Sequence, residues 1–437
     1  MKNLKSFTIS LVLVFSISYL CRGQENLKPS IDVRHLIDTV NLRLKNNYVF
    51  PEKADLIAKF LKSQVKKKTY ALLSKDPRKL AEQIQADIYN VHRDPHMFVN
   101  YDPSFAERNK DAAKPNDEEM LENRRYWQEN NYSFKKVELL PGNIGYFPFN
   151  NFVKYIKEAK PIIASALGFL SNSIAIIIDL RDNGGGEPAM VSQLESYFFK
   201  EKTHMNDMVN RSSKDTTFYY ADPAKTDGLT LSMPIYILTS KKTFSAAEDF
   251  IYAMQQAKRA VVVGEVTGGG AHPQMPFSVG QGFVVHIPFA RSLNPVTKTD
   301  WEVTGVIPEF KVDASKALVK AQELIFRKHQ TSAKTENEKH KFEYSINRLY
   351  VNQDLGTLPL DQFDKFAGTY GPLVIYRDGN KLFCNMDGII TELAHISKNL
   401  FVLDEGAHIE FVKDSKGTYS MARLFVEHGG VFEEVRK

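Results

Sequence analysis

A serine in the middle of the chain stands where a nucleophile could act. Residues 239–248 read TSKKTFSAAE and follow an apolar run, 234–238, that predicts a buried strand. A helical pattern begins directly after Ser245, so the sequence predicts its hydroxyl at a strand-to-helix junction, where the N–H of Ala246 would suit a developing oxyanion. The spacing of Ser245 and Glu248 is also that of a capping box, in which the serine simply closes the helix. These residues alone leave both interpretations open.

Two glycine-rich segments could approach that serine. Residues 179–186 read DLRDNGGG, and their consecutive glycines allow the backbone to come close to a ligand and offer a second oxyanion donor. The alternative is a tight turn, although the charged Asp179 and Arg181 beside a buried strand need partners. Residues 264–273 read GEVTGGGAHP and lack the Lys-Ser/Thr pair that a phosphate loop needs.

A serine nucleophile needs a general base and an acid that orients it. Among the eleven histidines, His96 stands out because residues 91–99, VHRDPHMFV, lie where a helical pattern gives way to a strand. His272 is the next candidate. A lone histidine is usually structural. Glu302, in the segment WEVTGVIP, is a candidate acid, although by itself it resembles a surface carboxylate.

The elements that must position these residues divide the chain into three folded regions. Apolar positions at helical spacing predict a helical bundle at the front. Buried apolar runs at 174–180, 233–238 and 261–263, each followed by small residues and a helical pattern, predict an α/β core. After residue 363, short strands alternate with turn signals and predict a small antiparallel β domain. The expected boundaries are 24–92 for the bundle, 93–330 for the core, 331–360 for a polar linker and 361–437 for the β domain.

The first 23 residues have the order of a secretory signal peptide. Lys2 and Lys5 precede an apolar run at 7–20, which is too short for a comfortable transmembrane helix. A lipid anchor on Cys21 is the alternative, but Leu20 is bulky for such a site. We therefore expect a secreted or periplasmic protein without a stable membrane span.

Composition excludes several function classes. The formal charge of +5 falls to +2 without the three basic residues of the expected signal, which does not give the basic footprint of a nucleic-acid binder. Cys384 is then the single cysteine, so an intramolecular disulfide is not expected. Cys/His clusters with zinc-ligand spacing are missing from the sequence, and we expect neither a metal nor a cofactor.

Together these segments resemble the tail-specific, or carboxy-terminal processing, serine peptidases. Five elements occur in the family's order over about residues 90–313: an Asp-x-His element, D-x-R-x-N-x-G-G, T-S-x-x-T-x-S-A-A-E, G-E-x-T-x-G and G-V-x-P. Gly270 stands where members with a Ser/Lys dyad carry the lysine. The chain is more similar to the branch of the tricorn core and the interphotoreceptor retinoid-binding protein, where a histidine and a glutamate accompany the serine. His96 and Glu302 fall in those places, and a PDZ domain does not fit between Asn100 and Gly142.

The resemblance implies a crotonase-like (ClpP-like) core of ββα units and a serine-type peptidase without cofactor. Ser245 would be the nucleophile, His96 the base and Glu302 its orienter, with the N–H groups of Gly185 and Ala246 holding the oxyanion. His272 remains the alternative base. The expected partner is a peptide or protein substrate, and the oligomeric state is not predicted. The alternative function is a non-catalytic protein that binds apolar ligands or peptides on the same scaffold.

Overall fold

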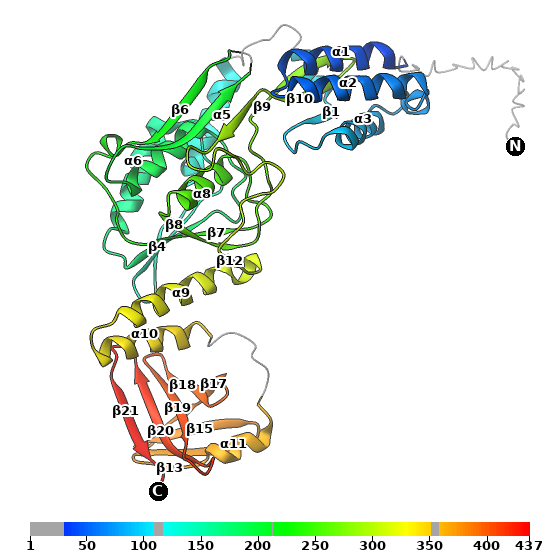
Figure 1. Cartoon of the computed structure of the whole chain (residues 1–437). Helices are drawn as coiled ribbons and strands as arrows, with labels where there is room; N and C mark the ends of the chain where they lie inside the picture. Colours follow the sequence, from blue (N-terminus) through cyan, green and yellow to red (C-terminus); the bar gives the residue numbers. More distant parts are fainter. Residues whose placement is uncertain (1–29, 109–116, 212, 351–357) are drawn as a thin grey trace, which may run out of the picture.

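The computed structural model describes residues 30–108, 117–211, 213–350 and 358–437. The expected signal peptide therefore lies outside the described residues. Three regions follow one another along the chain: an N-terminal helical region, a central α/β region and C-terminal β sheets (Figure 1). In the described residues, helices are too short or too polar to cross a membrane.

The N-terminal region is built from three helices on a small sheet. The helices are α1 (Val33–Asn47), α2 (Pro51–Lys66) and α3 (Pro77–Val91), and Asp32 and Asp76 cap the first and third through their side chains. Their apolar faces pack on the sheet β1-β10-β9, formed by β1 (Phe98–Tyr101), β10 (Phe283–Pro288) and β9 (Gln274–Gly280). Two of these strands, β9 and β10, belong to the C-terminal half of the predicted core. They form a hairpin that joins the N-terminal region to the central region.

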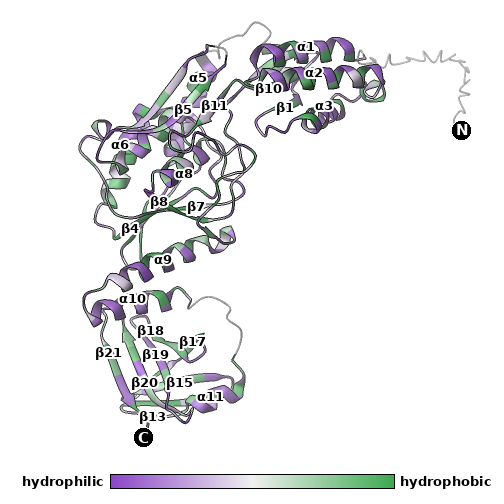
Figure 2. Ribbon diagram, in the orientation of Figure 1, coloured by the Kyte–Doolittle hydropathy of each residue, from purple (hydrophilic) through white to green (hydrophobic). Residues whose placement is uncertain are grey.

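The central region is a six-stranded mixed sheet in the order β12-β8-β7-β4-β3-β2. Only β2 (Glu138–Leu140) is antiparallel to its neighbour; β3 (Ile144–Pro148), β4 (Ala175–Asp179), β7 (Ile235–Thr239), β8 (Ala260–Gly264) and β12 (Phe310–Lys311) run parallel. Every residue of β4 and β7 is buried, which fits the continuous apolar runs in the sequence. Figure 2 shows hydrophobic residues concentrated in these strands. The predicted mixed α/β core is confirmed.

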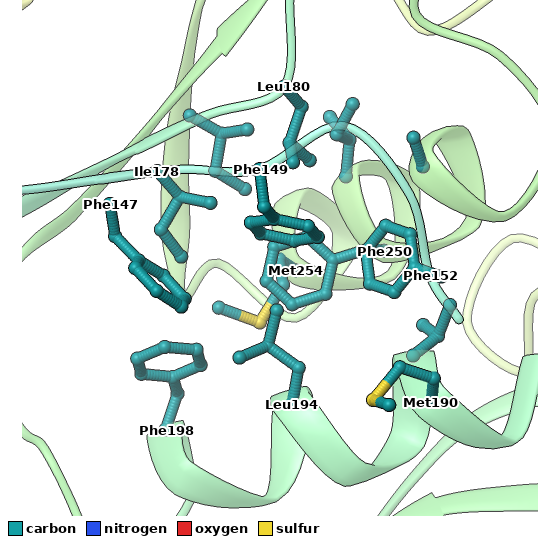
Figure 3. Close-up of a cluster of buried hydrophobic side chains, with 14 of the residues drawn as sticks. Phe147, Phe149, Phe152, Ile178, Leu180, Met190, Leu194, Phe198, Phe250 and Met254 are labelled. Atoms are coloured by element: carbon teal, nitrogen blue, oxygen red, sulfur yellow. The ribbon is translucent and has the colours of Figure 1, made fainter. Parts of the chain in front are cut away.

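Helices cover both faces of this sheet. On one face Ile176 and Ile178 pack with α6 (Ile156–Phe169), α7 (Pro188–Glu195) and α8 (Ala246–Gln256). Figure 3 shows Phe147, Phe149, Phe152 and Phe250 gathered in this layer. On the other face Ile177 and Leu238 pack with α9 (Ala317–Ser332). The strand side chains alternate between the two faces, and both faces are buried. This packing fixes the position in the sheet at which β7 ends and α8 begins.

A second, three-stranded sheet lies beside α8. It consists of β11 (Ala290–Leu293), β5 (Thr203–Asn210) and β6 (Thr216–Ala221), all antiparallel. Two further helices, α4 (Pro103–Arg108) and α5 (Asp117–Glu129), follow β1 in the chain.

The C-terminal region contains two antiparallel sheets, as predicted. The strands are β13 (Gly368–Tyr370), β14 (Leu373–Asp378), β15 (Lys381–Met386) and β16 (Ile389–Glu392), then β17 (Ala394–Ser397), β18 (Leu400–Asp404), β19 (Ala407–Lys413), β20 (Tyr419–Val426) and β21 (Val431–Val435). A short helix, α11 (Leu360–Phe366), precedes them. The segment expected as a linker, 331–360, contains α10 (Glu336–Arg348), whose capping box joins Thr335 and Glu338.

Candidate active site

Ser245 occupies the sharp turn between β7 and α8. Its φ of 55° and ψ of −123° belong to a region that residues with a side chain rarely adopt, and such strain is concentrated at functional turns. The turn is held from below by Glu248, whose carboxylate accepts the N–H groups of Ser245 (2.9 Å), Gly269 (2.7 Å) and Gly270 (2.8 Å) and the hydroxyl of Thr267. The predicted strand-to-helix junction is therefore present, with Glu248 joining it to the second glycine loop.

The Ser245 hydroxyl itself is left available. Ser245 and Glu248 have the arrangement of a capping box, in which each side chain faces the backbone N–H of the other residue. The N–H of Ser245 donates to Glu248, but the contact of the serine hydroxyl with the N–H of Glu248 does not reach hydrogen-bond geometry. The N–H of Ala246 likewise has no acceptor among the described residues. A hydroxyl and an amide donor without partners thus lie side by side at the start of α8, where the helix dipole favours negative charge.

The first glycine loop packs directly against this serine. A Cβ added to Gly185, whose φ is +103°, would lie 2.7 Å from the Cβ of Ser245 and 2.9 Å from the N of Ala246. The N–H of Gly185 donates to Asn183 Oδ1 at 2.9 Å, whereas the N–H of the next residue, Gly186, has no acceptor in the described part of the chain. Only a glycine lets the backbone come this close to the nucleophile.

The charges that flank this loop find partners, as expected for a buried strand end. Arg181 pairs with Asp179 through contacts of 2.5 to 3.1 Å and donates to the carbonyl of Ala314. Tyr146 donates to Asp179 at 2.6 Å. These contacts fix the start of the loop rather than face Ser245.

His96 lies on the opposite side of the second glycine loop. Its ring packs on Phe244 with 4.6 Å between centroids, and its backbone N–H donates to Asp94 Oδ1 at 3.1 Å. A Cβ at Gly270 would lie 2.4 Å from the Cε1 of His96. The position that carries lysine in the Ser/Lys dyad must therefore be a glycine here, because this imidazole takes the space.

The imidazole of His96 is in a state suited to a base. Burial lowers its pKa to about 4, so the ring is neutral at pH 7. Its Nδ1 is buried without a hydrogen-bond partner, and so is the Oε1 of Glu302. Within the described residues, no hydrogen bond joins the Ser245 hydroxyl to His96 or to His272. Catalytic hydrogen bonds are often long before substrate binds.

Glu302 and Asp94 complete a buried cluster around His96. One ligand-type atom from each of Asp94, His96 and Glu302 lies within 4.8 Å of the other two, a separation at which these groups could share a proton or hold a cation. Burial raises the pKa of Glu302 to about 8, with the charge of Asp94 adding to the effect and His272 opposing it. Its Oε2 accepts the N–H of Ala271 at 2.5 Å.

His272 belongs to the same cluster but is fully engaged. Its Nδ1 lies 3.0 Å from Asp94 Oδ2 and 3.4 Å from Glu302 Oε2, and its Nε2 lies 3.9 Å from Asp300. Burial alone would lower the pKa of His272, but the hydrogen bond with Asp94 and the charge of Glu302 raise it above the usual value. The acids around His272 thus favour its protonated form.

Several site residues had no role assigned from the sequence. Asp94 belongs to the recognised Asp-x-His element, yet its bond to His272 depends on the hairpin β9–β10 and could not be inferred from spacing. Tyr48, at the end of α1, donates to Asp94 at 3.0 Å, so the N-terminal helices contribute directly. Glu248 was considered only as the partner of a cap.

A small cavity opens beside Ser245. Its volume is about 60 Å³, and the residues that line it include Gly186, Met208, Ser245, Asp249, Ser292 and Trp301. Asp249 was not singled out in the sequence, because an acid in the first turn of a helix is ordinary.

Two family models match parts of the chain. Residues 143–312 match the family model described as Peptidase family S41, and residues 24–135 match the model described as the N-terminal domain of Peptidase S41 in eukaryotic IRBP. The chain is 28% identical over 181 residues to carboxyl-terminal-processing peptidase 2, chloroplastic, of Arabidopsis thaliana, covering 40% of this chain and 34% of the relative. It is 29% identical over 176 residues to a carboxyl-terminal-processing protease of Synechocystis, covering 40% and 39%.

The chain thus spans little more than a third of the curated relatives it matches. Among solved structures, it overlaps the photosystem II D1 C-terminal processing protease with a TM-score of 0.43 and 17% identity, over 65% of this chain and 94% of that one. The overlap with the tricorn protease has a TM-score of 0.41 and 13% identity, over 72% and 37%. The two regions matched by family models contain every residue of the site described above, and the chain belongs to peptidase family S41 with an N-terminal domain like that of IRBP.

Proposed function

We propose that the chain is an exported serine-type peptidase that hydrolyses peptide bonds with Ser245 as nucleophile, His96 as base and Glu302 as the residue that orients His96. The observation that carries the proposal is the state of Ser245: a strained positive φ, a hydroxyl without a cap bond and a neighbouring Ala246 N–H without a described acceptor. A serine that only capped a helix would spend its hydroxyl on the helix amides and would need no strained backbone.

The choice of base is supported by the different surroundings of the two histidines. His96 is neutral and has a buried, unpaired Nδ1, and the nearby Glu302 has an unpaired Oε1. A hydrogen bond between these two atoms, formed when substrate binds, would orient the ring and turn the other nitrogen, Nε2, to the serine, as in a triad. His272, in contrast, already contacts Asp94 and Glu302 through its Nδ1.

The reaction then proceeds in two halves. The Oγ of Ser245 attacks the peptide carbonyl while its proton passes to His96, and the oxyanion accepts from Ala246 and the first glycine loop. Gly185 and Gly186 are the candidate loop donors, and Gly186 is the freer one because Asn183 occupies the N–H of Gly185. Protonated His96 gives its proton to the leaving amine, and water hydrolyses the acyl-enzyme.

Two finer features belong to the proposal. The order β2–β3–α6, followed by β4 and later by β7–α8–β8, supports a crotonase-like core of ββα units. The charged and apolar start of the chain supports export. Sequencing of the processed protein should then find Gln24 at its N-terminus, and an unprocessed N-terminus would contradict export through a cleaved signal.

A binding protein is the second candidate, and one observation favours it. A groove of about 520 Å³ is lined largely by apolar side chains, among them Phe134, Val137, Phe147, Ile162 and Phe169. It lies apart from Ser245, so a protein that only binds apolar ligands there would not need a reactive serine.

Peptide cleavage tests the proposal. Ser245→Ala should lower kcat/KM on a mixed peptide library by about 10⁴-fold or more, because the nucleophile is removed while the fold is retained. The matched control is Ser171→Ala, an exposed serine after α6, which should cleave like the parent. Equal cleavage by Ser245→Ala and the parent would eliminate Ser245 as nucleophile.

A further inference from the structure

A buried carboxylate faces the cavity beside the nucleophile. Asp249 lies one turn after Ser245 on α8, is 5% exposed and lines the 60 Å³ cavity together with Met208, Ser292 and Trp301. Ser245, the residue before α8, and Asp249, in its first turn, both line this cavity, so the nucleophile and this acid face the same space. The proposed mechanism makes no use of Asp249.

Only one oxygen of this carboxylate is occupied by the protein. Asn206, on β5, donates its Nδ2 to Asp249 Oδ2 at 3.0 Å and is also 3.3 Å from the hydroxyl of Ser292. Oδ1 of Asp249 accepts no hydrogen bond from the described residues. Oδ1 is not among the fully buried atoms without a partner, and Asp249 lines the cavity, so Oδ1 is open to that space. A ligand that fills the cavity removes this oxygen from water and therefore gains from forming a hydrogen bond with it.

Asp249 is buried, and its burial affects its protonation. Burial raises the pKa of Asp249 to about 7, and the neighbouring Glu195 on α7, also buried, has its pKa raised by burial and by the charge of Asp249. Charged side chains that could neutralise Asp249 are missing from the residues described as lining the cavity. The cavity therefore offers a hydrogen-bond acceptor in an otherwise mostly apolar wall.

The size and place of the cavity limit what can enter it. A water occupies about 30 Å³ in the liquid, so a volume near 60 Å³ corresponds to roughly two waters, which suits a short side chain and is small for an aromatic or lysine side chain. Gly186 and Ser245 line the cavity, so it lies next to the carbonyl carbon that Ser245 would attack. We assign the cavity to the side chain on the acyl side of the scissile bond, the P1 residue.

We infer that Asp249 makes the enzyme prefer a P1 residue with a short hydroxyl-bearing side chain, serine or threonine, whose hydroxyl forms a hydrogen bond with Asp249 Oδ1, donating to the carboxylate or accepting from the carboxylic acid. This inference rests on the proposed function, because it names the substrate of the same site. A site that pairs with a substrate hydroxyl discriminates strongly against the analogue that lacks it, since its own buried acceptor is then left unpaired.

The test uses peptides that differ only at P1, in two isosteric or near-isosteric pairs. The parent enzyme should cleave threonine over valine, and serine over alanine, by about tenfold or more in kcat/KM, an effect of one unpaired buried acceptor. Asp249→Ala should bring both ratios close to one while changing cleavage of the valine peptide much less than cleavage of the threonine peptide. Asp249→Leu, which fills the cavity, is the second variant and should reverse the threonine-to-valine preference.

Asp227→Ala is the matched control, because this carboxylate is exposed and bound to Lys160, and both ratios should stay at the parent values. A parent enzyme that treats threonine and valine alike, or an Asp249→Ala variant that keeps the parent ratio, overturns the inference. Labelling of Ser245 by a small fluorophosphonate separates the two proposals. A protein that neither labels nor cleaves any peptide contradicts the proposed function itself, whereas one that labels and cleaves without P1 discrimination contradicts only the assignment of Asp249.

Discussion

Two groups of buried polar side chains lie near Ser245, one around His96 and one around Asp249, and they differ in their hydrogen-bond partners. On the side of His96, several acids and histidines gather, and Asp94 contacts Tyr48, His272 and the backbone N–H of His96. On the other side, Asp249 has one amide donor and no positive partner among the described groups around it. The first arrangement suits a group that must take up and release a proton. The second leaves an acceptor that a ligand can complete.

The two sides also differ in where their residues come from. The His96 side is assembled from the end of α1, the turn after α3 and the loop before β9, which the hairpin β9–β10 brings together. The Asp249 side is local to α8 and the sheet β11-β5-β6. Damage to the N-terminal helices should therefore affect proton transfer before it affects side-chain selection.

The largest effect is expected from the proton-transfer side. His96→Ala should lower kcat by about 10³–10⁴-fold, because the proposed base of Ser245 is removed. His272→Gln is the comparison, and it should retain clearly more activity, since His272 acts through Asp94 and Glu302. Steady-state kinetics on one peptide measure kcat for the two variants. A lower kcat for His272→Gln than for His96→Ala would make His272 the base.

A smaller loss is expected from a change that crowds the ring of His96 together with that of Phe244. Gly270→Ala would place its methyl group 2.3 Å from the Cζ of Phe244 and 2.4 Å from the Cε1 of His96, so these packed rings must shift and kcat should fall by about 10–100-fold. Gly168→Ala, where an added Cβ meets nothing within 4 Å, is the control and should keep the parent rate. Equal rates for both variants would mean that the position of the His96 ring does not limit catalysis.

The Asp249 side predicts a change in stability with pH. The pKa of Asp249 is raised from an ordinary 3.8 to about 7 in the fold, so the folded state holds a proton that the unfolded chain releases. Stability contributed by this proton is fully present below about pH 4 and is lost as the pH rises to about 7. Asp249→Asn cannot titrate, so its stability relative to the parent should increase over that window, by at most about 4 kcal/mol. Urea unfolding at pH 4, 5.5 and 7 measures the change, and a constant difference would show that Asp249 titrates normally.

The sequence predicted the parts of this site that local pattern determines. Ser245 lies at the predicted strand-to-helix junction because a buried apolar strand, a turn and an amphipathic helix follow one another along the chain. The N-terminal helices, the mixed core and the C-terminal antiparallel sheets were predicted for the same reason.

What could not be predicted depends on contacts between distant segments. The pairing of β1 with β10 and the bond between Asp94 and His272 join residues that are well over a hundred positions apart. Asp249 was hidden because its cavity exists only after β5 and β11 pack beside α8. The helix α10 was taken for a linker because its sequence is polar, although the Thr335–Glu338 capping box was a usable signal.

The most direct test of the central claim is the site and pH dependence of labelling by a small fluorophosphonate. Mass spectrometry of the labelled protein should find the adduct on Ser245. The labelling rate should fall as the pH drops through the low pKa of His96, near 4, and the His96→Ala variant should label far more slowly at every pH. An adduct on another residue, or labelling of Ser245 at an unchanged rate without His96, would contradict the account.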